Sequence, residues 1–225
     1  MNFKSVAALV PMRHHSQRVP GKNYRELAGK PLFHHILETL KKVPEIGKIA
    51  VDTDSDLIMD GIADRFPDVE IIIRPTELRP DNVPMNEILI HDISQIKADL
   101  YLQTHSTNPL LKSSTISEAI NHFRTNAGQF DSMFSVTRMQ TRFWDREGNP
   151  INHNPNELLQ TQDLPPVFEE NSCMYLFTPS KLLEKRHRLG DRPLMFEIPR
   201  EEALDIDEEI DFLIADLLMR HRLET

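Results

Sequence analysis

Cysteine, glycine and tryptophan are scarce in this 225-residue sequence, which contains one cysteine, seven glycines and one tryptophan. A single cysteine excludes an intramolecular disulfide and a cysteine-rich zinc site. It fits a reducing compartment, so we expect a cytoplasmic protein. No run approaches the roughly 20 apolar residues of a membrane span, and the first apolar run is too short for a signal peptide. We therefore expect no membrane partner.

Positive charge is also in deficit, because 26 lysines and arginines face 35 aspartates and glutamates, for a formal net charge of −9 at pH 7. General nucleic-acid binding needs a basic face, so we expect no nucleic-acid partner. A small anionic substrate is not excluded, since local arginines and metal ions matter more than the total charge. The length suffices to bury a core without disulfides, and we expect one domain over residues 1–225.

Apolar strand-like runs alternate with helix-like segments along the sequence. This alternation predicts an α/β fold, a Rossmann-like and mostly parallel sheet with helices on both faces. Binding groups then belong at the carboxyl ends of the strands. Strands are expected at 5–12, 48–54, 69–75, 98–105, 131–139, 172–179 and 194–199, and helices at 31–43, 55–66, 85–96, 114–123 and 207–221.

The first expected strand runs into a cationic loop, "VPMRHHSQRVPGKN", at residues 10–23. The loop matches neither the dinucleotide-binding glycine pattern nor the P-loop. Arg13 and Arg18 offer planar guanidinium groups and Lys22 a point charge, which together suit a triphosphate. The alternative is a solvated basic loop with surface ion pairs. Its position directly after a strand of an α/β sheet favours phosphate binding.

A pair of carboxylates, Asp205 and Asp207, lies in "LDIDEEID" near the C-terminus. In an extended segment both point to the same side, and a divalent cation would relieve their repulsion. Asp207 could instead cap the last helix, which would leave Asp205 unexplained. Together with the cationic loop, the pair suggests nucleotidyl transfer assisted by Mg²⁺.

Residues 140–166 interrupt the alternating pattern. This segment is polar, contains the only tryptophan and lacks a long apolar period. Loops of this length in compact domains are usually functional or part of an interface. We expect a hairpin-like extension inserted into the domain.

Several of these motifs together resemble one known family. The stretch "VPMRHHSQRVPGKNYRELAGKPL" is similar to the N-terminal signature of the sugar-acid cytidylyltransferases, the CMP-sialic acid synthetase family. The motifs "DTDS", "RPTELRPD", "LQTHSTNPLL", "ENSCMYLF" and "LDIDEEIDFLIAD" follow in the order that this family shows. The resemblance therefore covers nearly the whole chain.

The resemblance implies a Mg²⁺-dependent reaction of CTP with a 2-keto-3-deoxy sugar acid, which gives a CMP-sugar and pyrophosphate. It also implies a homodimer, in which the extension at 140–166 makes the dimer contact and reaches over the partner's site. The implied catalytic residues are Arg13, Lys22 and Asp207. The implied nucleotide-binding residues are Arg13, Ser16, Lys22, Asn23 and Arg74, the implied sugar-binding residues are Gln103, Asn171 and Tyr175, and the implied Mg²⁺ ligands are Asp205 and Asp207.

The sequence departs from the family pattern at three places. Leu111 replaces a usual arginine, Met85 stands where small and hydroxyl residues are common, and Glu169 and Glu170 precede "NSCMY" where sialic-acid enzymes carry an arginine. A carboxylate there would repel a sugar-acid carboxylate unless another cation intervenes. Two alternatives stay open: a related nucleotidyltransferase that acts on a phosphonate or an alditol phosphate, and a non-catalytic nucleotide-binding protein.

Overall fold

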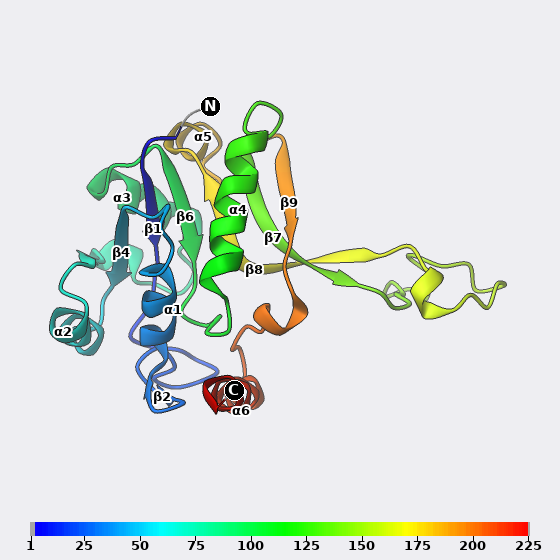
Figure 1. The fold of residues 1–225 in the computed structure, drawn as a ribbon, viewed down its shortest axis with the longest axis horizontal. Coiled ribbons are helices and arrows are strands. Elements are labelled where there is room, and N and C mark those ends of the chain that lie inside the picture. Colours follow the sequence, from blue (N-terminus) through cyan, green and yellow to red (C-terminus); the bar gives the residue numbers. More distant parts are fainter. Residues whose placement is uncertain (1–2, 225) are drawn as a thin grey trace.

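A seven-stranded sheet runs through the computed structural model, which describes residues 3–224 (Figure 1). The strand order is β5-β4-β1-β6-β8-β7-β9. Strand β8 is antiparallel to both of its neighbours, and all other pairs in this sheet are parallel. The strands of this sheet are β1 (Val6–Leu9), β4 (Lys48–Thr53), β5 (Glu70–Ile73), β6 (Leu100–Thr104), β7 (Ser132–Met139), β8 (Val167–Phe177) and β9 (Pro193–Glu197).

Helices cover both faces of the sheet, which confirms the expected α/β architecture. Apolar residues of α1, α2 and α4 pack against one face, and those of α3 and α5 pack against the other. The helices are α1 (Leu32–Leu40), α2 (Asp56–Arg65), α3 (Met85–Gln95), α4 (Ser113–Asn126), α5 (Pro179–Lys185) and α6 (Glu209–Glu224), with short 3₁₀ turns η1 (Thr76–Leu78), η2 (Thr161–Asp163) and η3 (Arg200–Glu202).

Strand β1 illustrates why this sheet is two-sided. Val6 and Ala8 belong to the core beneath α1, α2 and α4, whereas Ala7 and Leu9 belong to the core beneath α3 and α5. Successive strand side chains point to opposite faces, so a central strand covered on both sides must be apolar throughout. The four consecutive apolar residues of β1 are accordingly all buried.

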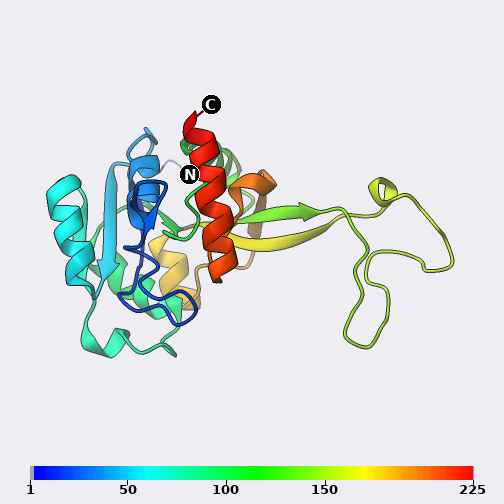
Figure 2. The ribbon, with the colours of Figure 1, turned by 90° about the horizontal axis from the view of Figure 1, so that it is seen from below.

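A third apolar cluster joins the two ends of the chain. Phe212 and Met219 of α6 pack with Val19 of the cationic loop and with Leu27 of the small hairpin β2–β3 (Glu26–Leu27 and Lys30–Pro31). Figure 2 shows α6, in red, beside this N-terminal region. The cluster fixes the segment before α6 against the loop that follows β1.

The segment 140–166 projects away from the rest of the molecule in both views (Figures 1 and 2). Strands β7 and β8 pair as an antiparallel ribbon that leads into it. Beyond the ribbon, the segment holds only the turn η2 and an isolated bridge between Trp144 and Pro150. Its role in dimerisation stays a prediction.

The helices of residues 3–224 include none with the length and apolar character that a membrane crossing requires.

His34 is a buried histidine of α1 whose two ring nitrogens have no hydrogen-bond partner within the described residues. Its ring lies edge-on to Phe33 and Phe66, with centroids 4.4 and 5.1 Å away. Burial, assisted by the nearby Arg65, lowers the pKa of His34 to about 4. The imidazole is therefore neutral in the folded protein at neutral pH.

We predict that His34 makes the fold acid-sensitive. In the unfolded chain a histidine has a pKa near 6.5 and binds a proton over a pH range in which folded His34 stays neutral. The free energy of unfolding therefore falls as the pH drops from about 6.5 to about 4. The loss is at most about 3 kcal/mol below pH 4 and at most about 2 kcal/mol at pH 5.0. Urea unfolding at pH 7.5 and 5.0 should show a smaller acid loss in His34→Leu than in the wild type. The exposed His122 provides the control, and an equal benefit from His122→Gln would contradict the assignment.

Candidate active site

A cavity of about 510 Å³ lies where β1, β5 and β6 end, which is the edge that the sequence predicts for binding. Its walls come from the cationic loop after β1, from Arg74 after β5, from the segment after β6 and from the segment before α6. The sequence-predicted residues that line it are Arg13, Ser16, Lys22, Asn23, Arg74, Asp205 and Asp207. Residues almost 200 positions apart therefore face one cavity.

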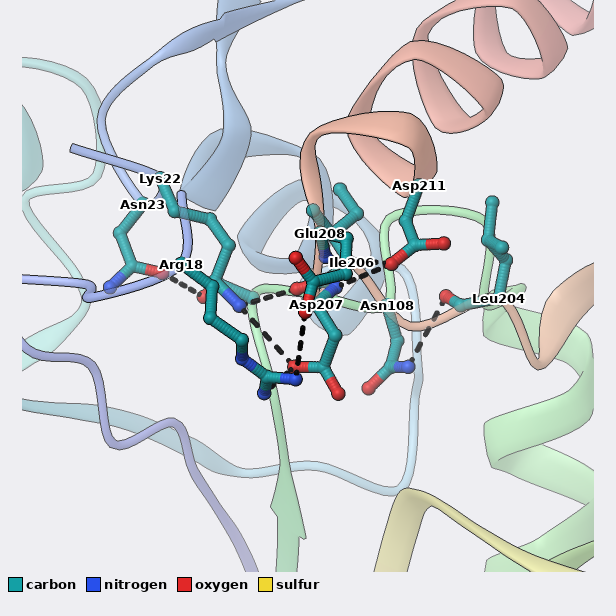
Figure 3. Close-up of polar contacts among 10 residues, drawn as sticks. Arg18, Lys22, Asn23, Asn108, Leu204, Ile206, Asp207, Glu208 and Asp211 are labelled. Atoms are coloured by element: carbon teal, nitrogen blue, oxygen red, sulfur yellow. Dashed lines mark hydrogen bonds and ion pairs between the residues drawn. The ribbon is translucent and has the colours of Figure 1, made fainter. Parts of the chain in front are cut away.

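Arg18 and Lys22 meet Asp207 across this cavity (Figure 3). Arg18 Nη2 lies 2.6 Å from Asp207 Oδ1, and Lys22 Nζ lies 3.9 Å from the same oxygen. Lys22 Nζ also donates a hydrogen bond to the backbone carbonyl of Ile206. Burial lowers the pKa of Lys22, and the carboxylates of Asp205 and Asp207 oppose that shift. The structure thus places cationic groups against the carboxylate pair.

Asp205 is the more enclosed member of the pair. Its Oδ1 is buried and has no hydrogen-bond partner within residues 3–224, although Thr107 bonds the carboxylate. Burial raises the pKa of Asp205, and the charge of Asp207 raises it further. An unpaired buried carboxylate oxygen beside a second carboxylate is a donor set that fits an oxygen-seeking divalent cation such as Mg²⁺. The residues present therefore fit the expected metal.

Asp207 does not cap the final helix. Helix α6 begins at Glu209, two residues later than the sequence suggests, and Asp211 supplies the capping side chain. The backbone N–H groups of Asp207 and Glu208 donate to Asp211 Oδ2 at 3.0 and 2.7 Å. This bonding leaves the carboxylate of Asp207 to face the cavity.

The other predicted residues of the loop all line the cavity, and one of them also holds the loop in place. Ser16 lines the cavity, and Arg13 does so while its guanidinium pairs with Asp81 from the segment after η1. Asn23 is buried and acts inside the loop. It donates to the carbonyl of Arg13 at 2.7 Å and accepts from the Ser106 hydroxyl at 2.7 Å. Asn23 therefore ties the cationic loop to the segment after β6.

Arg74 enters the cavity wall from a buried cluster of charged residues. Its guanidinium bonds Asp52 at the end of β4, and both side chains are almost wholly buried. Asp92 of α3 lies behind Asp52, and Oδ2 of each is buried without a hydrogen-bond partner among the described residues, although His91 Nδ1 lies 4.0 Å from Oδ2 of Asp52. Burial and the charge of Asp52 hold the pKa of Asp92 well above its usual range. The proton is therefore on Asp92, whose carboxyl group bonds that of Asp52.

A second cavity of about 550 Å³ adjoins the first, and Ser172, Asp205 and Asp207 line both. Arg200 is the only cation among the described residues that line the second cavity. The remaining lining residues are Thr137, Met139, Glu169, Glu170, Asn171, Ala203 and Leu204. The carboxylate pair therefore stands at the junction of a cation-rich cavity and an acidic one.

A bulge in β8 delivers Ser172 to this junction. Phe134 of β7 pairs with Tyr175 of β8, and Val136 pairs with Glu170. A step of two residues along β7 therefore matches a step of five residues along β8. Ser172 adopts a left-handed backbone with φ of 59°, which is uncommon for a residue other than glycine. Asn171 is buried and holds the bulge, since its side chain accepts from the Ser135 hydroxyl at 2.6 Å and donates to Thr137 Oγ1 at 2.9 Å. Bulges next to active sites commonly re-aim a side chain in this way.

Gln103 and Tyr175, which the sequence assigns to sugar binding, are fully buried. They face each other across β6 and β8, and Arg188 covers both. Arg188 Nη1 donates to Gln103 Oε1 at 2.6 Å, and its guanidinium lies 3.4 Å from the centroid of the Tyr175 ring. The cavity wall in front of them is formed instead by His105 and Ser172.

Comparisons with known proteins agree with this geometry. Residues 7–212 match the family described as cytidylyltransferase. This chain belongs to the cytidylyltransferase family. It is therefore a nucleotidyltransferase, and membership confirms the resemblance seen in the sequence.

Individual relatives of this cytidylyltransferase share about a quarter of its sequence. It is 26% identical over 227 residues to CMP-N,N'-diacetyllegionaminic acid synthase of Legionella pneumophila, a match that covers 95% of this chain and 96% of that protein. It is 25% identical to an N-acylneuraminate cytidylyltransferase of Streptococcus agalactiae, which covers 91% of this chain and 51% of that protein. The chain thus spans about half the length of this second relative.

Among solved structures, a CMP:2-keto-3-deoxy-manno-octonic acid synthetase complexed with CTP is similar, with a TM-score of 0.72, 15% identity and coverage of 97% of this chain and 100% of that one. A 4-diphosphocytidyl-2C-methyl-D-erythritol synthase from Anaerococcus prevotii gives a TM-score of 0.66 at 13% identity, with 96% of each chain covered. At such low identity these likenesses show the shared fold.

Sequence reasoning did not single out Ser172, Arg188, His105 or Asp81 for the site. The first lies in a strand-like stretch, and only the bulge turns it toward the cavity. Arg188 lies between α5 and β9, outside every quoted motif. His105 and Asp81 fall within the motifs "LQTHSTNPLL" and "RPTELRPD". His105 directly follows β6, and a polar residue just past a strand is the signal that could have identified it.

We predict that Asp92 makes stability fall as the pH rises. Because the pKa of folded Asp92 lies above that of the unfolded chain, the folded protein binds more protons between those two values. Asp92→Asn keeps the shape and a donor toward Asp52 but does not titrate. Thermal unfolding at pH 5.5 and 8.5 should show a smaller alkaline loss in Asp92→Asn than in the wild type. An equal or larger loss in the variant would rule out a protonated Asp92.

Proposed function

We propose that this cytidylyltransferase transfers CMP from CTP to a 2-keto-3-deoxy sugar acid of the sialic-acid type and releases pyrophosphate. The observation that carries the proposal is the meeting of Lys22 and Arg18 with Asp207 in a cavity at the carboxyl edge of the sheet. The names of its relatives, a legionaminic acid synthase and N-acylneuraminate cytidylyltransferases, support the same class of acceptor. A non-catalytic binding module would not require the carboxylate pair.

The nucleotide belongs in the first cavity, where the cations gather. The triphosphate would lie along the loop of residues 13–22, and Arg74 would hold the base end of the same cavity, next to Met85. The acceptor's anomeric hydroxyl would attack the α-phosphate and lose its proton to solvent, while the bond between the α-phosphate and pyrophosphate breaks. Lys22 and Arg18 then stabilise the negative charge that moves onto the leaving oxygens. Such transfer depends mainly on positioning and on charge neutralisation.

Asp205 and Asp207 would hold Mg²⁺, since an unpaired buried oxygen of Asp205 beside a second carboxylate suits this ion. When bound, Mg²⁺ neutralises phosphate charge and orients the triphosphate. Asp207 would have to release Arg18 in part, since Oδ1 of Asp207 is the atom that Arg18 bonds. Arg18 would then be free to turn toward the phosphates.

The sugar acid belongs in the second cavity, on the other side of the carboxylate pair. Glu170 is engaged there, because the Tyr175 hydroxyl donates a hydrogen bond to its carboxylate. Arg200 supplies the cation that an acceptor carboxylate needs among these acidic groups. The positive charge of Arg200 would offset the repulsion between the carboxylates of Glu169 and Glu170 and that of a sugar acid.

A homodimer through the projecting segment is part of the proposal. The segment leaves large apolar side chains in solvent, with Leu158 95% exposed, Ile151 58% and Trp144 51%. Exposed apolar groups gathered on a projection indicate a protein contact. Strand β8, which lines the second cavity, begins directly where this segment ends. The reaction would take place in the cytoplasm.

Pyrophosphate release tests the substrates directly. The panel combines CTP, UTP, GTP and ATP with eight- and nine-carbon 2-keto-3-deoxy acids, an alditol phosphate and a phosphonate. We expect turnover with CTP and at least one 2-keto-3-deoxy acid. Turnover confined to the alditol phosphate or the phosphonate would refute the proposed acceptor class.

We predict that Asp207→Asn lowers turnover by at least about 100-fold, because it removes a charged ligand while keeping the side-chain shape. The neighbouring Glu208→Gln is the matched control, since Glu208 lies outside the cavity lining. In a thermal-shift assay with CTP, added Mg²⁺ should stabilise the wild type and Glu208→Gln more than Asp207→Asn. Equal Mg²⁺ stabilisation of all three proteins would show that Asp207 does not hold the ion.

A further inference from the structure

Five side chains form a connected row at the wall of the first cavity, in the order His105, Gln103, Arg188, Tyr175 and Ser172. Arg188 stacks on Tyr175 and bonds Gln103, and Gln103 in turn bonds His105. The Gln103 amide lies 2.8 Å from His105 Nε2, and the Tyr175 hydroxyl lies 3.1 Å from the hydroxyl of Ser172. The two ends of this row, His105 and Ser172, both line the cavity.

Arg188 determines which way the Gln103 amide points. A guanidinium has five N–H donors and no acceptor, so the atom that it bonds at 2.6 Å must be the amide oxygen. The amide nitrogen of Gln103 therefore faces His105. Reversing the amide would set its N–H₂ against the N–H of Arg188 and would lose this hydrogen bond.

Gln103 then determines where His105 carries its proton. An amide N–H₂ only donates, so Nε2 of His105 must accept and carries no hydrogen. In a neutral imidazole the proton is then on Nδ1. Burial, with the charges of Arg188 and Lys22, lowers the pKa of His105 to about 4, so the ring stays neutral at neutral pH.

The Nδ1–H of His105 is a donor without a protein acceptor among residues 3–224, in a side chain that lines the cavity. The same wall contains Ser172 and Asp205, which line both cavities. His105 itself lines only the first cavity, so the acceptor can be its partner where the acceptor reaches from the junction of the cavities toward the triphosphate. Because Nδ1 already holds its proton, His105 cannot deprotonate the attacking hydroxyl through this atom.

We propose that His105 is a substrate-binding residue that donates Nδ1–H to an oxygen of the acceptor, and that Gln103 and Arg188 are positioning residues that fix this tautomer. The inference rests on the proposed function for the identity of the acceptor. The tautomer itself follows from the donor and acceptor chemistry of three side chains. It assigns a role to Gln103 without requiring this buried residue to touch the sugar.

Nitrogen-15 NMR of histidine-labelled protein tests the tautomer without any substrate. The His105 signals are assigned by their loss in His105→Asn. We expect a protonated Nδ1 and an unprotonated Nε2 from pH 6 to pH 8. In Arg188→Met, which keeps an apolar contact with Tyr175 but removes the donor, the signals should shift toward a mixture of tautomers. A proton on Nε2, or a cationic ring at pH 7, would overturn the proposal.

Steady-state kinetics tests the binding role with a matched pair of variants. Asn places its amide near the position of Nδ1, whereas Gln places its amide near that of Nε2. We expect His105→Gln to raise the KM for the sugar acid by about tenfold or more. His105→Asn should raise it less, and Arg188→Met should raise it with little change in the KM for CTP. Thermal unfolding confirms that each variant is folded.

Two results would overturn the binding role. One is a sugar-acid KM that rises as much in His105→Asn as in His105→Gln, and the other is a change confined to the KM for CTP. Absence of turnover with every sugar acid would refute the proposed function instead. In that case the NMR result would still decide whether Arg188 fixes the tautomer.

Discussion

The contact of Lys22 with the segment Ile206–Asp207 is the constraint on which the site depends. It joins the loop after the first strand to the segment before the last helix, and the apolar cluster of Val19, Phe212 and Met219 holds those two segments together. Electrostatics alone would not suffice, because Arg18 and Asp207 are about half exposed and such pairs contribute little. The apolar packing of α6 stabilises the association of these two segments, and this packing brings Arg18 and Lys22 close to Asp207.

Much of this arrangement was accessible from the sequence, and the reason is topological. Parallel strands bring their carboxyl ends to one edge, so a run of polar groups after each strand predicts a shared site. Lys22 and Arg74 were located in this way, whereas Asp207 was located by its spacing from Asp205. The antiparallel position of β8 between β6 and β7 could not be predicted from the sequence. Strand order depends on pairing energies between distant segments, which no local sequence pattern records.

The roles of individual polar residues were harder to predict. Asn23 and Asn171 fall in site motifs, yet hydrogen bonds to Ser106 and Ser135 occupy their amides. Gln103 and Tyr175 lie at the expected strand positions but are fully buried, and His105 and Ser172 line the cavity in their place. Each case turns on a partner far away in sequence, and burial obliges a polar group to find such a partner. A motif therefore marks the neighbourhood of a site more reliably than the residue that touches the ligand.

Neutralisation of selected groups shapes the field inside the cavity. Asp92 and His105 both lie close to charged residues, and burial makes each of them neutral. Burial raises the pKa of Asp92, so Asp92 keeps its proton, and lowers the pKa of His105, so His105 loses its second proton. Asp92 holds a proton, which leaves Asp52 to balance Arg74 alone, and His105 lacks one, which leaves Arg18 and Lys22 as the cations beside the carboxylate pair. Had both groups stayed ionised, an extra negative charge would weaken Arg74 as an anion-binding group and an extra positive charge would compete with Lys22 for phosphate. An acidic protein can in this way present a cationic cavity to a triphosphate. The buried Asp92 and His105 are neutral, so the charged groups that remain at the cavity are the cations and the carboxylates that pair with them.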